Sequence, residues 1–338
     1  MTPLVIPIFI SHQGCPHRCI FCDQHTITGH SGSAEEPVTP AAVENIIESW
    51  LNRPRKENNA GVQVAFYGGS FTGIALARQR ELLSAVKPYI KKGTVDSIRI
   101  STRPDYIDDT TVRILKEYSV STVELGIQSL DQEVLAASGR GHSVQEAVDA
   151  IRLLREQGFT IGAQIMCGLP CDNTMKLMTT AKQIAGLAPD FVRIYPVLVI
   201  KGSGLETMYR NITYKPLTLA KAVALCCRLK SIFDQHGIRV VRMGLQPSTE
   251  LALKVVAGPY HAAFGELVMA RTLFKKTRKI LHQTMIGREK HLSIAAADES
   301  AFRGPGNVSI KRLTALGLLD GVKLVFDRNQ VRNSVSVY

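Results

Sequence analysis

The sequence has 338 residues, 45% of them hydrophobic, and a mean hydropathy close to zero. No apolar run approaches the roughly 20 residues that cross a bilayer, and Met1-Thr2-Pro3 leads into an apolar run without the basic region of a secretory leader. We therefore expect a cytoplasmic protein without membrane association, built from one large domain and a smaller piece.

The charge is strongly basic, at +12 from 41 Lys and Arg against 29 Asp and Glu. A solvated helix face often carries several cations. Even so, an excess of this size favours a polyanionic partner such as nucleic acid. The basic side chains cluster in one tract, which contains Arg271, Lys275, Lys276, Arg278, Lys279, His282, Arg288, Lys290 and His291.

Strand-like and helix-like stretches alternate through the first two thirds of the chain. Apolar runs predict strands at 4–10, 62–67, 97–101, 122–127, 160–166 and 191–199. Amphipathic stretches predict helices at 40–51, 74–91, 109–118, 143–157, 174–187 and 217–236. Six such βα units with short connections indicate a parallel sheet, either open or closed towards a barrel.

The positions of unusual residues favour the barrel. Cysteines, paired glycines and polar residues follow one predicted strand after another, in 14–22, 68–70, 102–104, 128–129 and 168–170. Functional residues at the ends of many successive strands are typical of a barrel, and no Gly-x-Gly-x-x-Gly follows any strand. We predict an α/β fold in which residues 1–245 form a partial (β/α)6 TIM-like barrel.

Residues 246–338 are expected to form a small α+β extension. The pattern favours one more strand at 238–243 and a helix at 259–276. Two short β-like runs at 322–326 and 331–337 flank Asp327-Arg328-Asn329-Gln330, which predicts a β-hairpin.

The most informative feature is the spacing Cys-x3-Cys-x2-Cys formed by Cys15, Cys19 and Cys22 directly after the first predicted strand. Closely spaced thiols in a reducing compartment suggest metal or redox chemistry. A zinc site would need a fourth ligand, such as His17 or His25. Three thiolates without an obvious fourth ligand suit a 4Fe-4S cluster with one open iron. Cys226 and Cys227, by contrast, sit in a helical apolar pattern and are expected in the core.

This cysteine motif, with Phe21 before its last cysteine, resembles the radical S-adenosylmethionine (SAM) superfamily. The resemblance implies that Cys15, Cys19 and Cys22 hold a 4Fe-4S cluster and that SAM binds its open iron. It further implies reductive cleavage of SAM to a 5′-deoxyadenosyl radical inside a barrel that excludes water. An electron donor such as flavodoxin or ferredoxin is then expected.

Further segments resemble the SAM-binding positions of that superfamily. Gly68 and Gly69 match the Gly-Gly-Glu segment that meets the amino group of SAM, although Ser70 stands in place of the Glu. Gln128 is a candidate for the ribose hydroxyls, and Arg140 is one for the methionine carboxylate. Ser101 and Arg103 are similar candidates after the third strand, whereas the substrate-side catalytic residues are not identifiable.

Longer strings resemble one branch, the radical SAM domain of the Elongator catalytic subunit, over about residues 5–270. They are Phe66–Thr72, Glu124–Ser129, Arg140–Ser143 and Arg193–Pro196. This branch modifies the wobble uridine of tRNA with acetyl-coenzyme A, so tRNA or another RNA is the expected partner. The given sequence lacks the acetyltransferase pyrophosphate loop of that family, which leaves the use of acetyl-coenzyme A open.

Two alternatives remain at this stage. A coproporphyrinogen-dehydrogenase-like enzyme would share the Gly-x-Gln-Ser and Gly-Leu-Pro segments and act on a small molecule. A non-catalytic RNA-binding protein would use the metal centre only for structure. Neither the final product nor the oligomeric state follows from the sequence.

Overall fold

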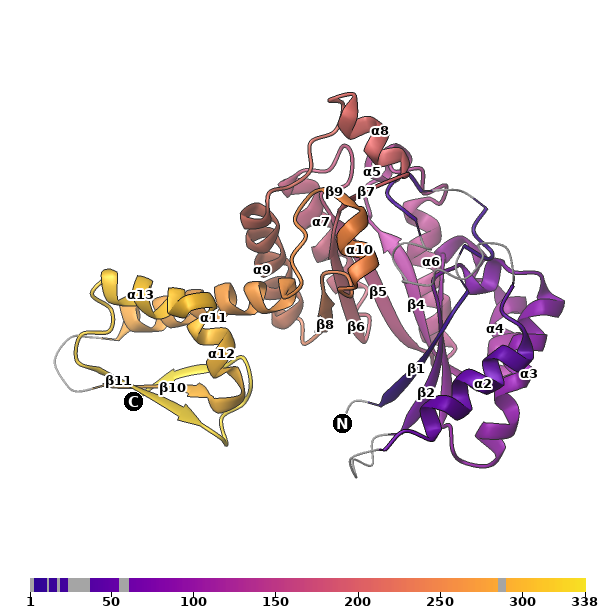
Figure 1. Ribbon diagram of the computed structural model, residues 1–338, viewed down its shortest axis with the longest axis horizontal. Coiled ribbons are helices and arrows are strands. Elements are labelled where there is room, and N and C mark those ends of the chain that lie inside the picture. The colour runs from indigo at the N-terminus through magenta and orange to yellow at the C-terminus, as the bar shows by residue number, and fades with distance from the viewer. Residues whose placement is uncertain (1–2, 11, 17–18, 24–36, 55–60, 285–289) are drawn as a thin grey trace.

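The structure is a computed structural model that describes residues 3–10, 12–16, 19–23, 37–54, 61–284 and 290–338 (Figure 1). The candidate zinc ligands His17 and His25, and Arg288 of the basic tract, lie outside these residues. Among the helices described, none is long and apolar enough to cross a membrane.

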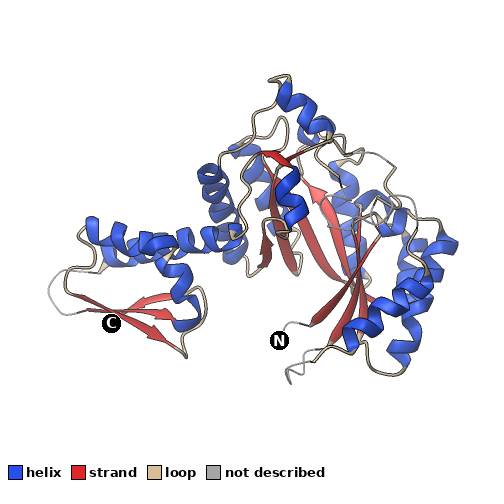
Figure 2. Cartoon of the chain, viewed as in Figure 1, coloured by secondary structure: helices blue, strands red, loops and turns tan. Residues whose placement is uncertain are grey.

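A seven-stranded parallel sheet forms the main body, in the order β1-β2-β3-β4-β5-β6-β8. Figure 2 shows that it curls into an open half-barrel, which confirms the predicted fold class. The run at 238–243 adds its seventh strand. The strands are β1 (Leu4–Phe9), β2 (Val62–Tyr67), β3 (Ser97–Thr102), β4 (Val120–Gln128), β5 (Thr160–Cys167), β6 (Phe191–Pro196) and β8 (Arg239–Met243).

Helices cover the convex face of this sheet and bury the main apolar core. They are α2 (Pro40–Leu51), α3 (Leu76–Lys91), α4 (Asp109–Glu117), α6 (Val144–Glu156), α7 (Thr174–Gly186) and α9 (Leu219–Gln235). Side chains that accept hydrogen bonds from backbone N–H groups start several of them, and Ser143 with Glu146 forms a capping box on α6. Cys226 and Cys227 of α9 are buried in the core, as predicted.

The concave face of the half-barrel is polar. Successive side chains of a strand point to opposite faces, so Ile98 and Ile100 of β3 enter the core while Arg99 points inward to the barrel. There the guanidinium of Arg99 lies 2.9 Å from the carboxylate of Glu124 on β4. The barrel interior is therefore a charged surface next to the C-terminal strand ends.

Short elements gather at the C-terminal end of the strands, and the sequence did not predict most of them. The expected strand 191–199 divides, because β7 (Val199–Ile200) leaves the main sheet and pairs with β9 (Val255–Ala257). The other short elements are the 3-10 turns η1 (Phe71–Gly73) and η2 (Pro104–Tyr106) and the helices α5 (Gln132–Ala137), α8 (Gly204–Arg210) and α10 (Thr249–Lys254).

From Phe264 onward the described residues form a three-stranded sheet and three helices, which we call the C-terminal extension. The helix expected at 259–276 is α11 (Phe264–Gln283), which begins later and runs further. It is followed by β10 (Lys290–Ala295), η3 (Ala296–Asp298), α12 (Glu299–Arg303), η4 (Pro305–Asn307), α13 (Val308–Ala315), β11 (Val322–Asp327) and β12 (Val335–Val337). The proposed domain boundary at residue 245 stays a prediction.

The predicted hairpin in this extension is wrong. β11 and β12 do not pair with each other, since β10 lies between them, parallel to β11 and antiparallel to β12. The reason is apolar packing: Leu292 and Ile294 of β10 are fully buried against α11 and its neighbours, so β10 takes the central position.

Candidate active site

The loop after β1 is locked onto the loop after β2 by close backbone contact. Gly14 has a φ of +70°, and a Cβ there would lie 2.1 Å from the carbonyl oxygen of Ser70. A Cβ on Gly69 would lie 2.5 Å from the carbonyl oxygens of both Ile10 and Gln13. Only glycine fits either position. The pair Gly68-Gly69 therefore also holds the cysteine loop in place, a role that its sequence motif did not suggest.

The cysteines of this loop lie in an apolar environment at the strand ends. Cys19 is buried, while Cys15 and Cys22 are half-buried. Around Cys19 and Phe21 lies an apolar cluster that includes Val134, Met166, Leu169, Val197, Val199 and Leu205. Burial raises the pKa of the Cys15 thiol, and the nearby Cys19 raises it further. Cys19 thus sits where water is largely excluded, and two nearby cations, Arg140 and Arg103, favour the thiolate of Cys15.

Arg140 supplies one of these cations and connects the cysteine loop to β4. Its Nη1 donates to Sγ of Cys19 at 3.1 Å, and its Nη2 donates to the carbonyl oxygen of Gly126 at 2.6 Å. The side chain is 6% exposed, and its Nε has no protein acceptor within the described residues. Arg140, a predicted site residue, thus directly contacts Cys19, one of the three candidate metal-ligating cysteines.

Arg103 and His142 are further buried polar groups at this end of the barrel. Arg103 forms a two-point ion pair with Asp105, at 2.8 and 2.9 Å, but its Nη1 finds no acceptor among the described residues. Both ring nitrogens of His142 are likewise unsatisfied, at 2% exposure. Burial, followed by the charges of Arg140 and Arg103, lowers the pKa of His142 to about 3. Buried polar atoms without a protein partner indicate a place where a polar ligand can bind.

Gln128 ends β4 in the left-handed region, with a φ of +67°, which is strained for a residue with a side chain. Its Oε1 accepts a hydrogen bond of 3.2 Å from Nε2 of Gln164 on β5. The sequence analysis did not identify Gln164, and it included His142 only within the string Arg140–Ser143, without a role of its own. Gln164 is a polar residue in an otherwise apolar predicted strand, a signal that could have identified it.

Ser70, which stands where the related motif has Glu, has a structural role here. Its Oγ shares a hydrogen bond of 3.0 Å with Thr102 and accepts one from the backbone N–H of Arg103. Thr102 also bonds to Thr72. Ser101, another predicted site residue, is half-buried on β3, and its hydroxyl makes no hydrogen bond to the described residues. The Ser70 hydroxyl therefore fixes the end of β3 that carries Arg103.

Among the described residues, no three His, Cys, Asp or Glu side chains are arranged to hold a metal ion, and this includes Cys15, Cys19 and Cys22. The histidines suggested as fourth ligands are outside the described chain.

Comparison with known proteins identifies the class to which this half-barrel and its cysteine loop belong. The model of the radical SAM superfamily matches residues 9–184, and the model of the radical SAM C-terminal domain matches residues 189–275. The chain belongs to the radical SAM superfamily and is a radical SAM enzyme.

Its relatives include proteins of known and unknown role. An uncharacterized protein of Methanocaldococcus jannaschii is 29% identical over 230 residues, covering 66% of this chain and 69% of that protein. The tRNA uridine(34) acetyltransferase of Methanocaldococcus infernus is 27% identical over 299 residues, covering 78% of this chain. The chain spans only 55% of the length of that transferase.

Solved structures agree on the fold. An archaeal Methanocaldococcus infernus Elp3 superposes with a TM-score of 0.63 at 22% identity, over 81% of this chain and 64% of that one. The coproporphyrinogen III oxidase HemN of Escherichia coli reaches 0.50 at 18% identity, over 70% and 53%. At these identities the likeness extends to the fold alone.

Proposed function

We propose that Cys15, Cys19 and Cys22 ligate a 4Fe-4S cluster and that SAM binds above it. The observation that carries this proposal is that two buried cations, Arg140 and Arg103, lie at the strand ends beside the three-thiol loop, each with one N–H group that has no acceptor among the described residues. Arg140 also contacts Cys19 directly. Three thiols supply three of the four ligands of a cubane and leave one iron for a small molecule.

The residues around the loop fit the polar parts of SAM. Arg140 and Arg103 can bind its carboxylate through charge-assisted hydrogen bonds, and Gln128 with Gln164 can bind its ribose hydroxyls. Gly68 and Gly69 leave room for a close backbone approach. Ser101 stays a candidate of the same kind. His142, uncharged because of its low pKa, can accept or donate one more hydrogen bond.

When bound, the cluster and SAM supply a one-electron cleavage that yields a 5′-deoxyadenosyl radical, with flavodoxin or ferredoxin as the electron source. The chain has to position SAM and to keep water and stray hydrogen donors away from the radical. The apolar cluster around Cys19 and Phe21 keeps water away. The glycine contacts between the loops after β1 and β2 help to position SAM.

We further propose that the substrate is a tRNA uridine. Three relatives are named as tRNA uridine(34) acetyltransferases, and the chain carries a matching electrostatic feature. Residues 267–288 contain no Asp or Glu. On α11, Lys275, Lys276, Arg278 and Lys279 are exposed, on the side of the helix opposite the buried Leu273 and Thr277. Such a face neutralises phosphates and releases counterions.

Mass spectrometry of tRNA nucleosides tests the substrate directly. Bulk tRNA from cells with the gene, from cells without it, and from cells complemented with a Cys19→Ala variant would be digested and compared. We expect one modified uridine to disappear in the deletion strain and in the Cys19→Ala strain. Identical nucleoside profiles in all three strains would refute the RNA substrate, and an altered porphyrin profile would favour the small-molecule alternative.

A further inference from the structure

The sheet of the C-terminal extension lies outside both matched family models, since the second of them ends at residue 275. Helices α11 and α13 lie on one side of it (Figures 1 and 2). Leu292, Ile294 and Leu324 point into the apolar core on that side. In the described part of the chain, no helix covers the other side.

Strand pairing identifies the residues on this open face. His291 of β10 is paired with Lys323 of β11, and mutual backbone hydrogen bonds of 2.8 and 3.1 Å pair it with Tyr338. Residues paired directly across strands share a face, and their neighbour Leu292 faces the helices. Lys323, His291 and Tyr338 therefore form one row across all three strands.

The row is accessible and contains two aromatic rings. Tyr338 is 69% exposed, and its ring centroid lies 5.5 Å from that of His291 in an edge-on arrangement. Lys323 is exposed beside them. Further along the sheet, Gln330 covers Ser293, whose Oγ donates to Gln330 Oε1. The open area is thus limited to the end of the sheet that carries the rings. Arg328, on the loop after β11, is exposed at the opposite end, since Asp327 before it pairs with Ala295.

The charge of the extension indicates the kind of partner. Residues 264–338 hold 13 Lys and Arg against 6 Asp and Glu, a net charge of +7 out of the +12 of the whole chain. An exposed aromatic pair beside a cation on an open sheet face suits unpaired bases, which stack on the rings while the cation meets a phosphate. A base-paired helix would offer no free base faces to this row.

We propose that this face binds single-stranded RNA, with bases stacked on Tyr338 and His291 and a phosphate held by Lys323. The inference rests on the proposed RNA substrate and assigns to the extension a contact separate from the cations of α11. It gives the enzyme a means to recognise an unpaired segment of its substrate.

Fluorescence anisotropy with the full-length chain tests this contact. The probes are a labelled ten-nucleotide oligouridine and a labelled, blunt-ended RNA duplex. Tyr338→Ala should weaken binding of the single strand about tenfold and change duplex binding less than about twofold, whereas Tyr338→Phe keeps the ring and should bind like wild type. Lys323→Gln should lower the salt slope of single-strand binding by about one. Lys182→Gln on α7, an exposed lysine outside the face, should leave the slope unchanged.

The possible outcomes separate this inference from the proposed function. If wild type binds oligouridine and both Tyr338→Ala and Lys323→Gln bind equally well, the sheet-face contact is refuted while the RNA substrate stands. If Tyr338→Phe loses as much as Tyr338→Ala, stacking is refuted. If wild type binds neither probe at low salt, both proposals fail. Unchanged thermal unfolding of each variant confirms that it is folded.

Discussion

Single residues around the cysteine loop hold atoms that the protein itself does not satisfy. Arg140 Nε, Arg103 Nη1 and both nitrogens of His142 are buried without an acceptor or donor in the described chain. Leaving such groups unpaired costs about 1–3 kcal/mol each. Such atoms also occur elsewhere, as at Gln79 and Asn333, but these four lie together at the end of the barrel where we put SAM.

Replacement of Arg140 tests this assignment. Arg140→Gln removes a charge-assisted contact to the SAM carboxylate, so the dissociation constant of SAM should rise about ten- to a hundredfold. Iron and sulfide content should stay close to wild type, because the three thiols remain. Calorimetric titration of SAM into reconstituted protein measures the change, with the exposed Arg113→Gln as control. Unchanged SAM affinity would contradict the assignment.

The buried carboxyl group of Asp172, after β5, should make the free energy of unfolding depend on pH. Burial raises its pKa to about 6 in the folded protein, against 3.8 for the ordinary group. The folded state then holds a proton that the unfolded state has lost, so this contribution to stability falls as the pH rises from about 4 to 6 and stays lost above that. Asp172→Asn should remove this slope and add about 1–3 kcal/mol at pH 7.

Urea unfolding of the apoprotein at several pH values checks this prediction. Asp320→Asn, at an exposed position, is the control for the change in net charge. Equal pH profiles for wild type and Asp172→Asn would show that Asp172 is not perturbed in the folded chain.

At the scale of elements, the parallel strands bring together a charged layer inside the half-barrel. Glu124 on β4 accepts from Arg99, from Arg193 Nη2 at 3.0 Å, and from the Tyr67 hydroxyl at 3.0 Å. Burial, then the charge of Glu124, raises the pKa of Tyr67, which keeps its hydroxyl protonated as the donor. One carboxylate thereby joins β2, β3, β4 and β6 across the concave face.

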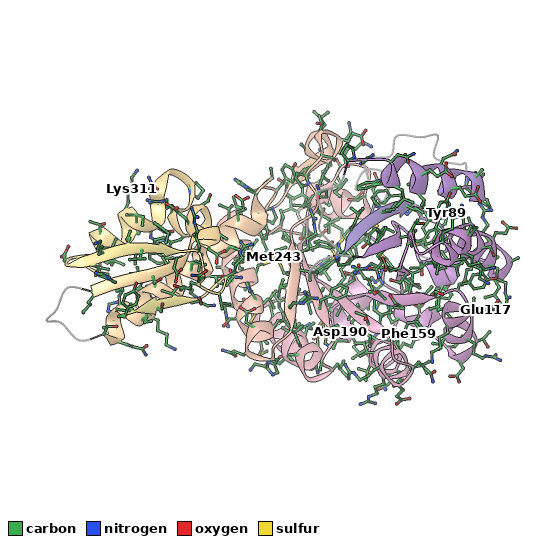
Figure 3. The ribbon with its side chains drawn as sticks, turned by 90° about the horizontal axis from the view of Figure 1, so that it is seen from below. Tyr89, Glu117, Phe159, Asp190, Met243 and Lys311 are labelled. Carbon is green, nitrogen blue, oxygen red and sulfur yellow. The ribbon has the colours of Figure 1, made fainter. Side chains whose placement is uncertain are left out.

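Loss of that carboxylate should weaken the sheet. Glu124→Gln leaves two partly buried guanidinium groups without their counter-charge, so the free energy of unfolding should fall by about 3 kcal/mol. Glu117→Gln is the matched control, since its ion pair with Arg80 is exposed on both sides and worth at most about 1 kcal/mol. Glu117 lies at the periphery of the molecule in Figure 3. Equal losses for both variants in urea unfolding would contradict the account.

The elements themselves were largely predictable where the pattern was local. Alternating apolar runs and amphipathic helices gave the partial barrel, and the cysteine loop follows its first strand as expected. The β10-centred sheet was not predictable in the same way, because its pairing depends on which strand buries Leu292 and Ile294 against α11. Gln164 was not identified, and His142 was given no role of its own, for a similar reason, since their role depends on burial and on partners distant in sequence.

At the scale of the whole molecule, the basic surface of α11 and the candidate active site lie in different places. The candidate active site lies at the C-terminal strand ends, while the extension that carries α11 projects from the other side of the barrel (Figure 1). An RNA that reaches both would have to span the molecule, as a folded tRNA can. The basic side of α11 then supplies affinity, and the barrel supplies the reaction.

Neutralising this side of α11 tests that division. The variant with Lys275, Lys276, Arg278 and Lys279 changed to Gln should bind tRNA at least tenfold more weakly at moderate salt. Its salt slope should fall by about one for each lost phosphate contact. SAM affinity should not change. The control carries the same loss of charge at exposed positions elsewhere, through Gln at Lys91, Lys92, Lys116 and Lys182. Equal weakening in both would show that only net charge matters.

The most direct test of the central claim is the release of 5′-deoxyadenosine. Protein reconstituted anaerobically with iron and sulfide, reduced with dithionite and given SAM would be analysed by mass spectrometry, beside a Cys19→Ala variant. We predict 5′-deoxyadenosine and methionine in equal amounts from wild type and neither from Cys19→Ala. Equal release from both proteins, or none from wild type with a full cluster, would contradict a radical SAM site at Cys15, Cys19 and Cys22.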